Sequence, residues 1–360
     1  MFISWGIIQT ALELGLIYAL VALALFLSYS MLNVCDLSTD GCYTLGCAVG
    51  SMVALAGHPV LAIFAAMAAG VVSGLITSLL QTKLGVESLL AGIIVNTGLY
   101  TINISIMGKS TLSLNDTDTV FTFTKSLLAG TVLEDFYKLI VVLVFVVIIA
   151  LLLLLFLGTR LGLSIRATGN NPAMVKSSSI NPGAMIIIGL CISGAITALA
   201  GCLIGEYNKT CDINMGTGMV TVALASLIIG ETIFGKKSIS FRAVGVIIGA
   251  CLYRIVVGIA MRFDLPASAL KLVSAIIVAV AISYPTLIKL IQRKHQQYSA
   301  RGKSLYRTLA MVFLVLTVVL ILLAVVLAGH RPLCVLLAAL CVLVTVWSAI
   351  QEKKGGVATC

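Results

Sequence analysis

The sequence is poor in charge. Charged side chains make up only 10% of its 360 residues, whereas 60% of the residues are hydrophobic. The mean hydropathy is +1.16. Soluble globular domains carry about 25% charged residues, so this composition excludes a soluble domain. The chain is expected to be a polytopic membrane protein.

The sequence also lacks the motifs of metal-binding, disulfide-linked and ATP-hydrolysing proteins. Its ten cysteines form no C-x-x-C pair, and several lie inside apolar runs, where cysteine is a small packing residue. Its three histidines are far apart in sequence. The segment GETIFGKK at 230–237 has Lys237 where a phosphate-binding loop carries Ser or Thr, and it follows an apolar helix. We expect no metal, cofactor or catalytic residue, and ATP hydrolysis would require another chain.

Long apolar runs are abundant. A spanning helix needs about 20 apolar residues, and these runs, with one shorter run, predict about eleven spans. Such runs exclude a membrane β-barrel, whose strands would be short and would alternate in polarity. The predicted fold class is an all-α polytopic membrane protein. The predicted spans cover residues 7–30, 41–57, 59–80, 88–107, 137–157, 183–205, 214–234, 243–261, 267–288, 308–328 and 333–350.

Lysine and arginine indicate the orientation, because they resist translocation when they lie in short loops. Most of the basic loop residues fall on one side of the membrane if residues 159–182 are cytoplasmic. This places the N-terminus outside and the C-terminus inside. The net charge of +10 is then a sign of topology, and no binding of nucleic acid is expected. The first apolar run is too long for a cleavable signal peptide.

A polar segment interrupts the apolar runs near the start of the chain. Residues 31–47 place Asp36 and Asp40 between two apolar runs with hardly any loop. Irregular backbone at membrane depth is tolerated where it lines a cavity, so the pattern predicts a broken helix beside a solute pathway. The alternative is a short cytoplasmic turn in which Ser38 or Asp40 caps the next helix.

A second polar pattern lies within the predicted span 88–107. Asn96, Tyr100 and Asn103 recur at helical spacing and share one face. Amides are costly in lipid, so this face is expected to point into the protein. It faces either the solute or a neighbouring helix, because asparagine also forms hydrogen bonds between helices. The candidate pathway residues are Asp36, Asp40, Asn96, Tyr100 and Asn103.

Isolated charges within spans are candidates for function. Glu13, Arg254 and Lys271 lie toward the outer side, where they are expected to pair with one another or to meet a carboxylate-bearing solute. Glu231 lies toward the cytoplasm near Lys236. Structural pairing is the simpler interpretation of each charge. Close helix packing is predicted by the G-x-x-x-G pairs at Gly46 and Gly50, Gly70 and Gly74, Gly201 and Gly205, and Gly245 and Gly249.

Residues 159–182 form a basic island between apolar runs. Gly169 is expected to break the chain, and one of the two asparagines that follow is expected to cap a short helix from Pro172 to Ser179. The mixed apolar and basic surface suits a protein groove. The alternative, an interfacial helix on anionic lipid, normally has a longer amphipathic pattern. The candidate coupling residues are Arg166, Gly169, Asn171, Met174 and Lys176, with Val175 on the same surface.

Three separated motifs resemble one family of transport proteins. GLSIRATGNNPAMVKSSSINP at 162–182 resembles the coupling-helix segment of permease subunits in the ABC importer family that includes the ribose-type and branched-chain amino-acid permeases. DLSTDGCYTLGCAVG at 36–50 matches the Asp-Leu-Ser segment and Gly-rich helix of this family. LLAGIIVNTGLYTINISIMGKSTL at 89–112 is similar to a subgroup linked with tryptophan or tyrosine uptake and encoded beside lipoprotein-like binding proteins. The resemblance covers roughly residues 5–290.

The resemblance implies a complex of several proteins in a bacterial cell membrane. Its expected members are a second permease subunit, as in a homodimer, cytosolic ATPase subunits that grip residues 165–180, and an external binding protein that delivers an amino acid. The implied mechanism is alternating access. Alternatives are a secondary transporter or channel driven by an ion gradient through Glu13, Asp36 or Asp40, and a receptor-like membrane protein. Sugars, nucleosides and branched-chain amino acids remain open as solutes.

The family pattern also predicts the domain organisation. Residues 1–290 form the transmembrane core, with the coupling helix at about 165–180. A basic cytoplasmic linker follows at 291–307, and residues 308–360 form an appended transmembrane hairpin with a short tail. The last two apolar runs contain no glycine, which suits helices that face lipid.

Overall fold

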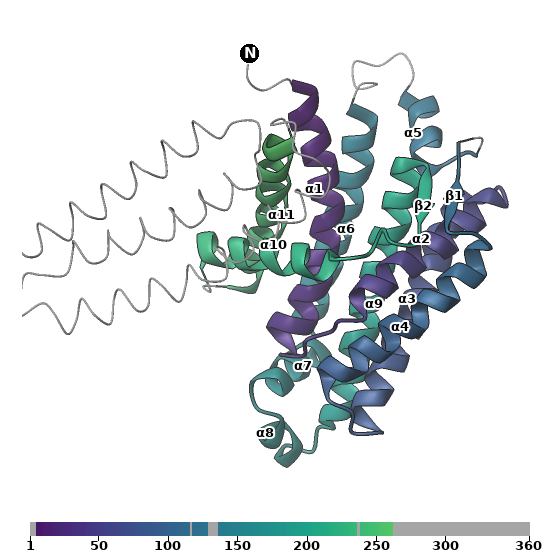
Figure 1. Ribbon diagram of the computed structural model, residues 1–360. Coiled ribbons are helices and arrows are strands. Elements are labelled where there is room, and N and C mark those ends of the chain that lie inside the picture. The colour runs from purple at the N-terminus through teal and green to yellow at the C-terminus, as the bar shows by residue number, and fades with distance from the viewer. Residues whose placement is uncertain (1–4, 116, 129–135, 236–237, 262–360) are drawn as a thin grey trace, which may run out of the picture. The chain divides into compact units, whose positions relative to one another are not determined.

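The computed structural model describes residues 5–115, 117–128, 136–235 and 238–261 (Figure 1). All contacts discussed below lie in the compact unit formed by residues 1–259. Within the described part, six helices are long and apolar enough to cross a membrane, and the predicted all-α polytopic fold is confirmed. The predicted spans 267–288, 308–328 and 333–350 lie outside the described residues, as do the linker and the hairpin.

Each span predicted before residue 261 corresponds to a helix. The largest difference is at the predicted span 214–234, which starts at Met219 because residues 213–218 form turns. In chain order the elements are α1 Trp5–Leu25, the π-helix η1 Phe26–Met31, α2 Thr39–Leu55, α3 Pro59–Thr82, α4 Ser88–Met107, β1 Thr111–Ser113, α5 Val120–Leu128, α6 Tyr137–Gly158, α7 Arg160–Asn170, α8 Pro172–Ser177, α9 Pro182–Asn208, β2 Thr210–Asp212, α10 Met219–Phe234 and α11 Ile239–Met261.

Helix α9 is the centre of the described part. It is 27 residues long and packs against α1, α2 and α3. A Cβ at Gly201 would collide with the carbonyl oxygen of Tyr43 on α2, and a Cβ at Gly70 on α3 would collide with that of Gly194. The helices therefore meet backbone to backbone, as the G-x-x-x-G pairs predict.

The chain leaves helical structure at residues 32–38, between η1 and α2. Ser193 Oγ donates to the carbonyl oxygen of Ala24 at 3.0 Å, and Cys42 Sγ donates to that of Gly194 at 3.4 Å. Ser193 and Gly194 lie well inside α9, so the end of α1 and the start of α2 meet it far from either of its ends. The break itself begins beside α7, because a Cβ at Gly169 would collide with the Met31 carbonyl oxygen, and its residues Asp36 and Ser38 are buried.

The two ends of the bundle carry different elements. The N-terminus of α1 and helix α5 lie at the top of Figure 1, and α7 and α8 lie at the opposite end. The antiparallel ribbon pairs Thr111 of β1 with Asp212 of β2, so the segments that follow α4 and α9 lie together. The predicted cytoplasmic island is therefore at the end opposite the start of α1, which the sequence places outside.

Candidate functional site

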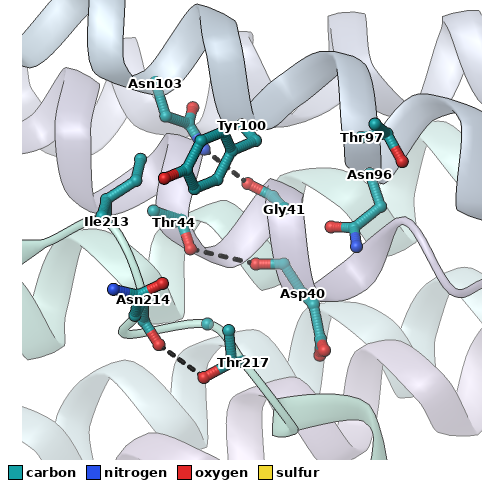
Figure 2. A pocket seen from close by; sticks show the side chains of 11 residues that line it. Asp40, Gly41, Thr44, Asn96, Thr97, Tyr100, Asn103, Ile213, Asn214 and Thr217 are labelled. Atoms are coloured by element: carbon teal, nitrogen blue, oxygen red, sulfur yellow. Dashed lines mark hydrogen bonds between the residues drawn. The ribbon is translucent and has the colours of Figure 1, made fainter.

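A cavity of about 270 Å³ lies between α2, α4 and the turns at 213–217 (Figure 2). The structure brings Asp40, Asn96, Tyr100 and Asn103 together around it, whereas Asp36 does not line it. Small polar side chains from three distant segments form most of its wall. The lining residues that the sequence pattern did not single out are Gly41, Thr44, Thr97, Ile213, Asn214, Gly216 and Thr217.

The Asp40 carboxylate joins α2 to the first turn of α10. Its Oδ2 accepts the N–H of Gly218 at 2.9 Å, and its Oδ1 accepts the N–H of Val220 at 2.8 Å. These N–H groups have no partner within α10, and a carboxylate also interacts favourably with the helix dipole there. Asp40 therefore caps α10 and not its own helix, which corrects the capping alternative. A Cβ at Gly216 would collide with the Asp40 carbonyl oxygen, so this glycine permits the close approach.

The three residues that α4 contributes from its polar face differ in their surroundings. Asn103 is 1% exposed, and its Nδ2 donates to the Gly41 carbonyl oxygen at 3.2 Å. Tyr100 is 50% exposed, and Asn96 is half-buried. A Cβ at Gly41 would lie 2.7 Å from Asn96 Oδ1, so α2 and α4 meet closely at this glycine. Asn103 thus bonds the two helices together, and Asn96 and Tyr100 keep accessible polar groups at the cavity wall.

Asp36 shapes the break in the helix. It is 3% exposed, and its Oδ1 accepts the Ser38 N–H at 2.9 Å and the Ser38 hydroxyl at 2.6 Å. Thr39 Oγ1 donates to the Asp36 carbonyl oxygen at 2.9 Å, and Thr77 Oγ1 on α3 donates to Ser38 Oγ at 3.2 Å. These bonds satisfy polar groups of an irregular segment inside the bundle, as buried polar groups require.

Helix α8 has the cap that the sequence predicts. Asn171 Oδ1 accepts the N–H of Met174 at 3.1 Å, and Pro172 occupies the first helical position. The helix ends at Ser177, two residues earlier than predicted. Met174 is 67% exposed, and Lys176 is exposed as well. A short capped helix therefore presents an apolar and a basic side chain together.

Two predictions for this segment are wrong. Gly169 does not break the chain, because it lies inside α7, which continues to Asn170. A Cβ at Gly169 would collide with the Met31 carbonyl oxygen, so the glycine permits α7 to pack against η1. Val175 is 4% exposed and faces the protein, so it is not part of the outer surface of α8. Arg166 lies on α7 and is half-buried.

Two intramembrane charges have partners other than the predicted ones. The Tyr207 hydroxyl donates to Glu13 Oε2 at 2.7 Å. The Arg254 guanidinium lies over the Tyr18 ring, with Cζ 5.1 Å from the ring centroid. In the part of the chain that the structure describes, Glu13 and Arg254 therefore do not form the predicted pair, and Lys271 lies outside that part.

Glu231 belongs to a cluster that joins three elements. The Arg242 guanidinium of α11 forms an ion pair with Glu231 Oε1 of α10, with Nε 3.1 Å away. It also donates to the Ser30 hydroxyl of η1, which itself donates to Glu231 Oε1 at 2.7 Å. Arg242 Cζ lies 5.3 Å from the centroid of the Phe26 ring. The predicted neighbour Lys236 lies outside the described residues.

A buried carboxylate near the C-terminal end of α9 was missed in the sequence. Glu206 is 1% exposed, and its Oε2 accepts the N–H of Val120, the first residue of α5, at 2.9 Å. Cys202 Sγ donates to Glu206 Oε1 at 3.7 Å. The available signal was a single acidic residue just beyond the predicted span 183–205. Its role in the structure is to cap α5.

The described residues contain no group of three or more His, Cys, Asp or Glu side chains arranged to hold a metal ion. Their cysteines are free thiols. Cys47 and Cys211 Sγ lie 3.8 Å from the Sδ atoms of Met215 and Met107, respectively. These are packing contacts of soft, apolar side chains.

Comparisons with known proteins agree with this architecture. The family described as "Branched-chain amino acid transport system / permease component" matches residues 7–282. The "Tyrosine transport system permease protein" of Clostridioides difficile (strain R20291) is 36% identical over 274 residues, which cover 76% of this chain and 89% of that protein. An uncharacterized protein of Rickettsia prowazekii (strain Madrid E) is 33% identical over 284 residues, which cover 77% and 97%. No solved structure matches the chain significantly.

The family match includes the cavity, helices α7 and α8, and the cluster around Glu231. The family comprises transport permeases and not enzymes. With its six candidate spans in the described part, the chain is a multi-pass protein of the cell membrane. It belongs to the family of permease components of branched-chain amino acid transport systems.

Proposed function

We propose that this chain is the membrane-spanning subunit of an ATP-driven ABC importer for an amino acid. The observation that carries the proposal is helix α8, which presents Met174 and Lys176 at the end of the bundle opposite α5. An exposed apolar side chain beside a basic one suits a protein partner. The family match supports transport, and the resemblance of residues 162–182 supports an ATPase as the partner.

Helix α8 is suited to transmit force. The Asn171 cap and the buried Val175 side chain hold it at its start and on its inner face. Without such anchors, a helix of six residues would be marginal on its own. A load applied to Met174 or Lys176 would therefore reach the bundle. Arg166 and Gly169 on α7 extend the same coupling region, because α7 packs against η1.

The cavity is the proposed solute site. The turns before α10 line it with Ile213, Asn214, Gly216 and Thr217, and α2 contributes Asp40 from its first turn. Irregular backbone inside a membrane protein is tolerated where it lines a cavity, and transporters bind solutes at discontinuous helices. Asn96 and Tyr100 offer polar and aromatic groups. A carboxylate has about four lone-pair sites, so Asp40 keeps acceptor capacity beyond its two helix N–H bonds.

The proposed solute is an aromatic amino acid. The relative that is 36% identical is named for tyrosine transport, and the cavity volume of about 270 Å³ is close to the lower bound for small-molecule sites. Tyr100 can stack with an aromatic ring, and the Asp40 carboxylate attracts an ammonium group. Branched-chain amino acids, sugars and nucleosides are the solutes to compare.

The proposed transport core is residues 1–290, with residues 165–180 as its coupling region. The family match ends at residue 282, which supports a boundary soon after it. We place the basic linker 291–307 and the hairpin 308–360 outside the transport path. The proposed partners are two ATPase subunits, a second copy of this chain and an external binding lipoprotein.

The test is to reconstitute the chain with its ATPase and binding protein in liposomes, and to measure ATP hydrolysis as each solute is added. Tyrosine or tryptophan is expected to stimulate hydrolysis, and the ATPase should co-purify with the chain. Stimulation by a sugar or nucleoside alone would overturn the choice of solute. Solute uptake that an ion gradient drives without ATP would overturn the proposed function.

A further inference from the structure

Helix α10 connects the proposed solute cavity with the elements next to the coupling helices. It has 16 residues and is therefore about 24 Å long at 1.5 Å per residue. Asp40 holds its first turn, and the cluster of Ser30, Glu231 and Arg242 holds its last turn. We propose that α10 transmits movement between the coupling helices and the cavity, with Asp40 and Glu231 as its two positioning residues. This inference rests on the proposed function.

At the cavity end, α10 and the cavity wall cannot move independently. The Asp40 carboxylate accepts the N–H groups of Gly218 and Val220, and Asp40 itself lines the cavity. The turns at 213–217, which form another part of the wall, lead directly into α10. A shift of α10 would therefore either break the two bonds of Asp40 or carry the cavity wall with it.

At the other end, an ion pair joins Glu231 of α10 to Arg242 of α11, and the Ser30 hydroxyl joins both residues to η1. Side chains of Glu231 and Arg242 are 14% and 15% exposed, so solvent screens their attraction less than it screens a surface pair. Ser30 adds hydrogen bonds to both. Removal of one member would leave a largely buried charge without its partner, which is costly. The ion pair therefore fixes α10 to α11, and the hydrogen bonds of Ser30 and the contact of Arg242 with Phe26 connect both helices to η1.

The connection continues from η1 to the coupling helices. Helix α7 contacts η1, and Gly169 of α7 lies directly against the Met31 carbonyl oxygen, one residue after Ser30. Helix α7 also contacts α8, which carries Met174 and Lys176. Short π-helical segments are frequently found at functional sites in proteins. An unbroken series of contacts thus runs from α8 through α7 and η1 to Glu231.

Helix α11 moves with α10 in this arrangement. A Cβ at Gly230 would collide with the Gly245 carbonyl oxygen, and a Cβ at Gly249 would collide with that of Ser226. The two helices therefore pack backbone to backbone, and the ion pair of Arg242 with Glu231 joins them near the last turn of α10. A pair packed in this way shifts as one body, because close-packed contacts do not deform continuously.

The test uses Glu231→Gln and Ser30→Ala in the reconstituted complex with ATPase and binding protein. Glu87→Gln is the matched control, because Glu87 is exposed and makes no side-chain cap bond at α4. We expect both cluster variants to bind the ATPase, and we expect solute transported per ATP to fall about tenfold in Glu231→Gln. The control should keep the wild-type ratio.

Exchanging the charges of Glu231 and Arg242 distinguishes a loss of transmitted movement from a loss of protein stability. Glu231→Arg combined with Arg242→Glu should restore part of the transport ratio that either single variant loses. An unchanged ratio in Glu231→Gln and Ser30→Ala would overturn the inference, and so would a loss of uptake that only parallels a loss of folded protein. If Glu231→Gln fails to fold, the solute transported per ATP in Ser30→Ala tests the inference by itself. Absence of ATP-dependent uptake in the wild type would instead refute the proposed function.

Discussion

The two sides of helix α2 differ in how closely they are packed. Toward α9 it packs without space, since a Cβ at Gly46 would collide with the Ala198 carbonyl oxygen and Tyr43 meets Gly201. Toward α4 and the turns at 213–217 it borders a cavity. One side thus fixes the position of the helix, and the other presents polar groups to the cavity that we propose as the solute site. Substitutions on the first side should affect folding, and those on the second should affect transport.

The largest effect is expected at the α2–α9 contact. Gly201→Ala places a Cβ against the Tyr43 carbonyl oxygen, so the helices must separate. Overpacking costs about 1–3 kcal/mol when side chains can adjust, and a clash with backbone should exceed that range. We expect loss of monodisperse protein and a large fall in the melting temperature.

Gly98→Ala is the control for this prediction. Nothing lies within 4 Å of a Cβ at Gly98, which is exposed on α4. Alanine in place of a helix-interior glycine stabilises by about 0.5–1 kcal/mol. Equal melting temperatures for Gly201→Ala and Gly98→Ala would contradict the close contact between α2 and α9.

The next largest effect is expected at α8, where the double variant Met174→Asp with Lys176→Glu should uncouple transport. Both side chains are exposed, so the fold should survive while the contact with the ATPase is lost. Uptake should fall about tenfold or more, because interface centres carry most of the binding energy. Lys83→Glu, which changes an exposed lysine between α3 and α4, is the control. Normal assembly and uptake in the double variant would refute the coupling role.

A smaller and more selective effect is expected at Tyr100. Tyr100→Ala removes an aromatic side chain from the cavity wall. Aromatic pairs contribute about 0.5–1.5 kcal/mol beyond buried area, so affinity for tyrosine should fall about three- to tenfold. Affinity for an aliphatic amino acid should change less. Tyr29→Ala, another exposed tyrosine that does not line the cavity, is the control. Equal losses for both solutes would argue against an aromatic contact.

The smallest effect is expected at the cap of α8. Asn171→Ala removes the oxygen that accepts the Met174 N–H and should destabilise the helix locally by about 1 kcal/mol. The bundle should remain folded, while affinity for the ATPase falls about fivefold, the equivalent of that energy. Asn171→Asp keeps a capping oxygen and should restore affinity. Failure of this rescue would show that the cap does not set the affinity.

Local features of the fold could be predicted from the sequence. The hydropathy of a segment depends on its own residues, so the spans 88–107 and 137–157 match α4 and α6 closely. The cap of α8 also depends on adjacent residues, Asn171 and Pro172. In each case the residues that determine the structure lie within the segment itself.

Features that depend on distant partners could not be predicted. Asp40 caps a helix whose first bonded residue lies 178 positions away, so no local pattern indicates it. The sequence suggested that Gly169 breaks a helix. The actual need for glycine at this position is the close approach of the Met31 backbone, which belongs to another element. Asn214 and Thr217 joined the cavity wall only because a turn returns to α2. Residue types indicated the candidate site, and tertiary contacts selected its members.

The most direct test of the account is the uptake of labelled tyrosine into liposomes that hold this chain, its ATPase and the external binding protein. The account predicts that uptake requires ATP hydrolysis and that Met174→Asp with Lys176→Glu lowers it about tenfold or more without loss of folded chain. Uptake that persists without ATP, or that is unchanged in this variant, would contradict the account.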